Sequence, residues 1–480
     1  MANSGAGGAW SGYGSIMAGN LLSPMDAMFL QMESSESMMH VAGLIQVKPT
    51  GNATEVAGQL RDELMSMTDV QPPWNMKLQT PGLLKNPLHR WVEDDKFDID
   101  YHVRRSALAS PGDERELGTL VSRLHSHPLD FSRPPWEAHL IEGLENGNLA
   151  LYVKVHHSLV DGYTAMKTMI RSMSSDPNVT DTPFFFQMRP PEREPREAEE
   201  STTDLGAVLS AVGSQLTSVK DIAGAVLRLN RTRRKEEDAL VPSLQAPHTI
   251  FNVRIGRNRR FATQQYNVER LKAVAKASGG TLNDVALAIC GGGLRTYLAD
   301  LGELPDKPLI AFVPVNVRPK DDPGGGNAVG GMLASLGTNI ADPAERMQAI
   351  IASTRAAKEQ MESMTRNAIL AYTMFLAAPF VVQTGVARAN LAKAVAPTFN
   401  VVMSNVPGPR ESLYFRGNRM ESVYPVSIPV HGVALNITCE SYADTLNFGF
   451  IGCREAVPRL QRLAVACGHA LEELESVYGS

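Results

Sequence analysis

Residues 149–162 read Leu149-Ala-Leu-Tyr-Val-Lys-Val-His156-His157-Ser-Leu-Val-Asp161-Gly162. The first seven are aliphatic, β-branched or aromatic apart from one lysine, which is typical of a strand. Successive side chains of a strand point to opposite faces. We therefore expect one of the two histidines to face a cavity and the other to point into the fold. Asp161 and Gly162 would form the turn that ends the strand.

The paired histidines suggest general-base chemistry. A neutral imidazole, with an ordinary pKa of about 6.5, can take a proton from a hydroxyl at neutral pH. We take His157 as the candidate catalytic base, and whether His156 is catalytic or structural stays open. Asp161 is the candidate support of the loop, for example through an arginine ion pair. Gly162 is expected to adopt a backbone conformation that a side chain would forbid.

Further segments extend this pattern along the chain. They are Leu22–Leu30, Met39–Gly43, Pro134–Gly143, Asn283-Asp284 with Gly293–Leu298, Pro314–Arg318, Ser404–Pro409, and Ala434–Thr438 with Ser441-Tyr442. His-His-x-x-x-Asp-Gly is the active-site signature of the CoA-dependent acyltransferase superfamily. With the other segments, which run in the family's order, the chain resembles the bacterial wax ester synthase/diacylglycerol acyltransferase family. Pro135 departs from the pattern, because leucine is commoner there.

The resemblance implies an α/β fold of two chloramphenicol-acetyltransferase-like domains, joined by a helical crossover, with a substrate tunnel between them. It also implies a structural role for Asp161. The implied reaction moves a fatty acyl group from acyl-CoA to diacylglycerol or a long-chain alcohol, with His157 as general base and no metal or redox cofactor. Two alternatives stay open: a condensation-type acyltransferase that uses carrier-bound thioesters, and a non-catalytic lipid-binding protein.

A second group of polar residues has two interpretations. Asn283 can begin a helix over residues 285–297, and Ser404 and Asn405 precede a Pro-Gly-Pro loop, so turn and cap chemistry explains them. Alternatively these three residues and Thr438 hold the substrate or the developing oxyanion. Loss of one oxyanion donor can cost about 3 kcal/mol of transition-state stabilisation.

Composition narrows the class of protein. A chain of 480 residues with 43% hydrophobic residues is long enough for two domains with sizeable cores. A net charge of −5 argues against a nucleic-acid partner. The four cysteines lie far apart, which favours reduced structural thiols in a cytoplasmic protein. No serine-hydrolase elbow or P-loop is present, and no histidine pair has metalloprotease spacing.

Charged and proline-rich segments suggest the domain organisation. We predict a flexible tail over residues 1–20, which lacks the features of a signal peptide, and an N-terminal domain with the histidine motif over residues 21–189. Residues 190–247 would form a linker with an amphipathic helix at 205–229. A second acyltransferase-like domain would span residues 248–480 and start with a strand at 251–255.

Both implied acceptors are insoluble in water, so membrane contact is expected. Residues 367–387 carry no formal charge, but Pro379 and several polar residues interrupt them. A buried or interfacial helix is therefore favoured over a membrane span. The helix predicted at 205–229 ends in a basic cluster, Arg228, Arg231, Arg233, Arg234 and Lys235. We expect peripheral association with the inner membrane face or lipid droplets.

Overall fold

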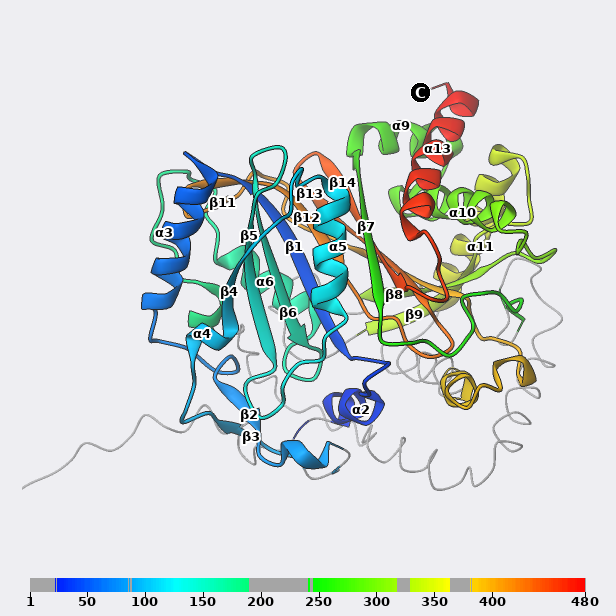
Figure 1. Cartoon of the computed structure of the whole chain (residues 1–480). Helices are drawn as coiled ribbons and strands as arrows, with labels where there is room; N and C mark the ends of the chain where they lie inside the picture. Colours follow the sequence, from blue (N-terminus) through cyan, green and yellow to red (C-terminus); the bar gives the residue numbers. More distant parts are fainter. Residues whose placement is uncertain are drawn as a thin grey trace, which may run out of the picture.

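The computed structural model describes residues 22–189, 241–316, 329–362 and 380–479, except residues 23, 85, 87, 88, 242–244 and 381. Two six-stranded mixed sheets form its framework (Figure 1). In spatial order, the first contains β11 (Tyr414–Phe415), β12 (Asn418–Val426), β1 (His40–Lys48), β6 (Leu149–His156), β5 (Trp136–Glu142) and β4 (Val103–Ala107). The second contains β7 (Arg259–Asn267), β14 (Thr445–Cys453), β13 (Leu435–Tyr442), β10 (Val401–Val406), β8 (Ile310–Asn316) and β9 (Val329–Ser335).

Helices pack around both sheets. They are α2 (Pro24–Met32), α3 (Ala53–Ser66), α4 (Ile99–His102), α5 (Glu114–His125), α6 (Gly162–Arg171), α9 (Val268–Ser278), α10 (Leu282–Asp300), α11 (Pro343–Glu362) and α13 (Leu460–Tyr478). Figure 1 shows α9, α10, α11 and α13 gathered beside the second sheet. Helix α5 contacts β7, so it joins the two halves. A small hairpin of β2 (Met76–Leu78) and β3 (Trp91–Glu93) lies apart from both sheets.

Burial explains two of these elements. All eight residues of β6 are buried, as expected for an interior strand with an almost continuous apolar run. In α10, a Cβ atom on Gly293 would lie 2.5 Å from the sulfur of Cys467 in α13. Glycine at this position therefore lets the two helices pack closely. All four cysteines are buried and free.

The first sheet is completed by strands from the far end of the chain. β12 pairs antiparallel with β1, from Ala42 opposite Val426 to Lys48 opposite Arg419. β11 continues the sheet beyond β12. Residues 414–426 therefore follow the proposed boundary at residue 248 in sequence but belong to the sheet of the N-terminal half.

The local predictions have mixed outcomes. The strand predicted at 149–155 is confirmed and extends one residue further. The strand predicted at 251–255 is wrong: this segment is irregular, and the Asn252 side chain donates hydrogen bonds to the carbonyls of Phe399 and Gly432. The helix predicted at 205–229 and most of residues 367–387 lie outside the described residues. Within the described part of the chain, no helix is long and apolar enough to cross a membrane.

Candidate active site

A cavity of about 350 Å³ lies where the two sheets face each other. Strands β1, β6 and β12 and helix α6 line it from the first half, and β8, β10 and β13 line it from the second. Six of the eight predicted site residues line this cavity: His157, Asp161, Gly162, Ser404, Asn405 and Thr438. The fold therefore brings together residues that are nearly 300 positions apart in sequence.

Strand β6 separates the two histidines, as the alternation of its side chains predicts. Val153, Val155 and His157 line the cavity. The side chains between them occupy the opposite, buried face of the strand, and His156 is one of these. His157 therefore faces the cavity, and His156 points into the fold.

The imidazole of His157 is fixed at the wall of the cavity. Its backbone N–H donates to the carbonyl of Met39 at 2.9 Å. Its ring stacks on Phe29 with the ring centroids 4.1 Å apart. The buried Nδ1 atom has no hydrogen-bond partner on another described residue. Burial lowers the pKa of His157 to about 4, although the Asp161 carboxylate opposes the shift. The imidazole is consequently neutral at pH 7.

His156 is held in one tautomer by its neighbours. The backbone N–H of Ser158 donates to Nδ1 at 3.2 Å. Because Nδ1 accepts this bond, the ring proton sits on Nε2, which faces the Glu33 carboxylate at 3.3 Å. Glu33 also accepts the backbone N–H of Met39. Through Glu33, which directly follows α2, the end of β6 at His156 is thus connected to Met39, which directly precedes β1. These contacts support a structural role for His156.

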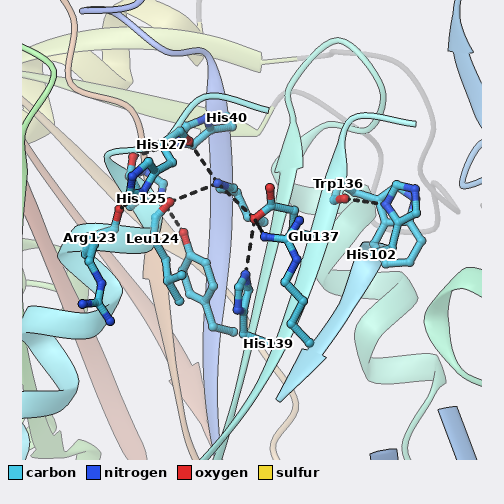
Figure 2. A network of polar contacts seen from close by, with 12 residues as sticks. His40, His102, Arg123, Leu124, His125, His127, Trp136, Glu137 and His139 are labelled. Atoms are coloured by element: carbon cyan, nitrogen blue, oxygen red, sulfur yellow. Dashed lines mark hydrogen bonds and ion pairs between the residues drawn. The ribbon is translucent and has the colours of Figure 1, made fainter. Parts of the chain in front are cut away.

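A buried ionic network continues along the same face of β6 (Figure 2). The Lys154 ammonium is fully buried and donates to the carbonyls of Leu124 and His127, both at 3.0 Å. Its Nζ lies 3.5 Å from a carboxylate oxygen of Glu137. That carboxylate also contacts His139 at 3.3 Å. The network positions β6 against α5 and β5.

Asp161 begins helix α6. Its carboxylate accepts the Thr164 backbone N–H at 2.9 Å and the Thr164 hydroxyl at 2.8 Å, which is an N-cap arrangement. The explanation predicted for Gly162 is wrong. Gly162 has no positive φ, and a Cβ atom there would meet nothing within 4 Å. Gly162 lines the cavity.

The second half contributes a polar wall. Ser404 of β10 pairs in register with Thr438 of β13. The Thr438 hydroxyl donates to the Asn436 side-chain oxygen at 3.0 Å, so its single proton is already engaged. Asn283 does not line the cavity. It lies in the first turn of α10, where Thr281 and Asp284 form the capping box.

Comparison with known proteins places this geometry in a family. The model of the wax ester synthase/diacylglycerol acyltransferase catalytic domain matches residues 22–286, and that of the C-terminal domain of the same family matches residues 325–475. The chain belongs to the wax ester synthase/diacylglycerol acyltransferase family. The resemblance inferred from the sequence motifs is therefore confirmed.

Relatives of this family member match over nearly their whole length. A putative diacylglycerol O-acyltransferase of Mycobacterium tuberculosis is 52% identical, over 96% of this chain and 98% of that protein. The O-acyltransferase WSD of Acinetobacter baylyi is 38% identical, over 95% and 97%. The solved wax ester synthase/diacylglycerol acyltransferase from Marinobacter aquaeolei is 37% identical, with a TM-score of 0.75 over 96% of this chain and 100% of that one.

A more distant likeness concerns the fold alone. The first condensation domain of the CDA synthetase has a TM-score of 0.50 at 14% identity, over 96% of both chains. Together with the Marinobacter structure, it confirms the predicted α/β fold of two acyltransferase-like domains. Among the described residues, no group of three or more His, Cys, Asp or Glu side chains is arranged to hold a metal ion.

Sequence reasoning missed several residues of the cavity. Met166 and Met169 of α6 and Met173, just after that helix, all line it. Glu440 lines it as well. Its signal was present: Asn436, Thr438 and Glu440 alternate along β13, so they share one face of the strand.

The N-cap role of Asp161 gives a stability prediction. Asp161→Ala removes the acceptor for the Thr164 N–H, so we expect a loss of about 1 kcal/mol of stability together with reduced activity. Asp161→Asn keeps a cap acceptor and should melt close to the unchanged protein. Thermal unfolding followed by circular dichroism measures both. An Asp161→Ala protein that melts normally would leave the cap without a stabilising role.

Proposed function

We propose that this family member is an O-acyltransferase that moves a fatty acyl group from acyl-CoA to diacylglycerol, to a long-chain alcohol, or to both. One observation carries the proposal: the neutral imidazole of His157 faces a cavity that both halves of the chain line. The names of the relatives, diacylglycerol O-acyltransferase and wax ester synthase, support the choice of substrates.

The proposed step is direct transfer. His157 accepts the hydroxyl proton of the acceptor while that oxygen attacks the thioester carbon. The tetrahedral intermediate collapses, the carbon–sulfur bond breaks, and the CoA thiolate takes the proton from the imidazolium. An ester and free CoA result, without a covalent acyl-enzyme.

The cavity wall supplies the remaining contributions. Ser404 is the better placed of the two hydroxyls to donate to the oxyanion, because the proton of Thr438 is committed to Asn436. Asn405 offers an amide beside it. The apolar lining, which includes Trp74 and Val155, excludes water that would otherwise hydrolyse the thioester.

An acyl-transfer assay tests the function. Labelled palmitoyl-CoA is offered with dioleoylglycerol, with hexadecanol, and with water alone, and the lipid products are separated. We expect an ester with at least one acceptor and much slower hydrolysis. Tight lipid binding without any ester would favour the non-catalytic alternative. Transfer only to carrier-bound acceptors would favour the condensation-type alternative.

The lowered pKa of His157 predicts the pH dependence. Only the neutral imidazole accepts a proton, so kcat/KM should rise with pH through about 4 and be level from pH 5 to 7. An ordinary histidine would give half-maximal activity near pH 6.5. Initial rates are measured from pH 3.5 to 8, with a melting curve at each pH to separate titration from unfolding. A midpoint near 6.5 would contradict the burial of the base.

We also propose peripheral attachment to an anionic membrane surface or to lipid droplets. The support is the basic cluster that follows residues 205–229, together with the water-insoluble acceptors. The protein should sediment with anionic vesicles at low salt. High salt, or replacement of Arg231, Arg233 and Arg234 with glutamate, should release it. If neither high salt nor the glutamate substitutions reduce sedimentation with the vesicles, the basic cluster is not the anchor.

A further inference from the structure

Glu440 is a buried acid in the cavity wall that the proposed mechanism does not use. It lies on β13 two residues beyond Thr438, on the same face, and pairs in register with Val406 of β10. Only 5% of its surface is exposed, yet it lines the cavity. Across the described residues, no hydrogen bond or ion pair engages its carboxyl group. A polar group buried in this way costs free energy unless something else satisfies it.

The strand registers place Glu440 away from the catalytic end of the cavity. The catalytic end is marked by His40 opposite His156, at the start of β1. Tyr442 marks the other end. Its hydroxyl donates to the carbonyl of Met420 at 2.9 Å, and Met420 pairs with Val47 near the end of β1. Glu440 lies between Thr438 and Tyr442, so it is about 7 Å farther along the strand than Thr438.

The surroundings of Glu440 favour its protonated form. Most of the residues that line the cavity are apolar, and they include Ile45, Met420 and Val423. Burial raises the pKa of Glu440 to about 8. The protonated carboxyl carries an O–H donor in the wall of the cavity, and a plain alkyl chain offers this donor no acceptor.

We infer that Glu440 is a specificity-determining residue that donates a hydrogen bond to an oxygen of the lipid substrate remote from the reacting group. The recognised oxygen is an ester carbonyl of a glyceride acceptor or a hydroxyl on an acyl chain. The inference rests on the proposed acyl transfer and adds a preference: oxygenated lipids over plain alkyl chains.

Glu440→Leu and Glu440→Gln separate hydrogen bonding from shape. Leucine removes the donor, whereas glutamine retains an uncharged one. The kcat/KM ratio is measured for dioleoylglycerol against hexadecanol, with palmitoyl-CoA as donor. It is also measured for 12-hydroxystearoyl-CoA against stearoyl-CoA, with hexadecanol as acceptor. The first ratio tests an acceptor carbonyl, and the second tests an oxygen on the acyl chain.

For Glu440→Leu we expect one of the two ratios to fall about tenfold, with faster use of the plain substrate, because leucine suits an alkyl chain better. Glu440→Gln should keep at least half of the original ratio. If both ratios stay within about twofold in a Glu440→Leu protein that melts normally, the inference is wrong. If Glu440→Leu fails to fold, loss of the ratio in a folded Glu440→Gln protein also overturns it.

Lipid binding distinguishes failure of this inference from failure of the proposed function. Absence of transfer by the unchanged protein would reject acyl transfer, but the preference can still be measured without turnover. A fluorescent long-chain alcohol bound in the cavity is displaced by dioleoylglycerol, by hexadecanol or by 12-hydroxystearate, and the displacement constants are compared with those of Glu440→Leu. A selective loss of affinity for an oxygenated lipid supports the site, and equal affinities reject it.

Discussion

Replacing His157 with alanine is expected to lower kcat by about 10² to 10⁴-fold while the protein remains folded. The imidazole faces the cavity, and burial keeps it neutral, so its loss removes the proton acceptor. The ring also stacks on Phe29, but its Nδ1 has no partner on another described residue, so few contacts are lost. Transfer of labelled palmitate, with melting curves alongside, measures the effect.

The exposed His127 provides a matched control. Its side chain lies outside the cavity, and its contact with Lys154 runs through its backbone carbonyl. His127→Ala should therefore keep most of the activity. If His157→Ala retains more than about a tenth of the activity, another group is the base.

Replacing Glu137 with alanine is expected to destabilise the fold by about 3 to 5 kcal/mol, because it leaves the ammonium of Lys154 buried without its carboxylate. The two groups are 3.5 Å apart, and both are almost completely buried. Burial favours the protonated form of Glu137, but the hydrogen bond from His139 and the charge of Lys154 hold its pKa at about 2. Urea unfolding measures the loss.

The double variant Glu137→Leu with Lys154→Met isolates the pair. It removes both charges and leaves apolar side chains of similar length, so much of the lost stability should return. If the double variant is as unstable as Glu137→Ala, the loss reflects packing around β5 and not an uncompensated charge. A cost below about 1 kcal/mol for the single variant would show that water reaches Lys154.

Local patterns predicted the strand that ends at the two histidines well, because the information that specifies it lies in neighbouring residues. Alternation along β6 was enough to assign opposite faces to His156 and His157. The family motifs then located Ser404 and Thr438, which the structure brings to the same cavity. The role of His157 as base remains a prediction until its variant is measured.

Other features depend on contacts that one segment does not contain. Gly162 suggested a strained backbone, but neither its backbone conformation nor the space around it requires a glycine. Asn283 lies beside Asp284, which forms the capping box of α10 with Thr281. The local sequence does not show that Asn283 lies outside the cavity. The segment 251–255 has the composition of a strand, yet tertiary contacts of Asn252 replace a strand ladder.

Strand β12 comes from the C-terminal half of the chain but completes the sheet of the N-terminal half. This arrangement has a consequence for the synthesis of the chain. On the ribosome, N-terminal segments emerge first, and domains generally fold as units during synthesis. Here β1 lacks one of its two neighbours until residues 418–426 have been translated. Until then the backbone groups on that edge of β1 are open to pairing with other chains. A fragment that ends before β12 should therefore aggregate when expressed alone, and addition of the missing half during synthesis should rescue its solubility.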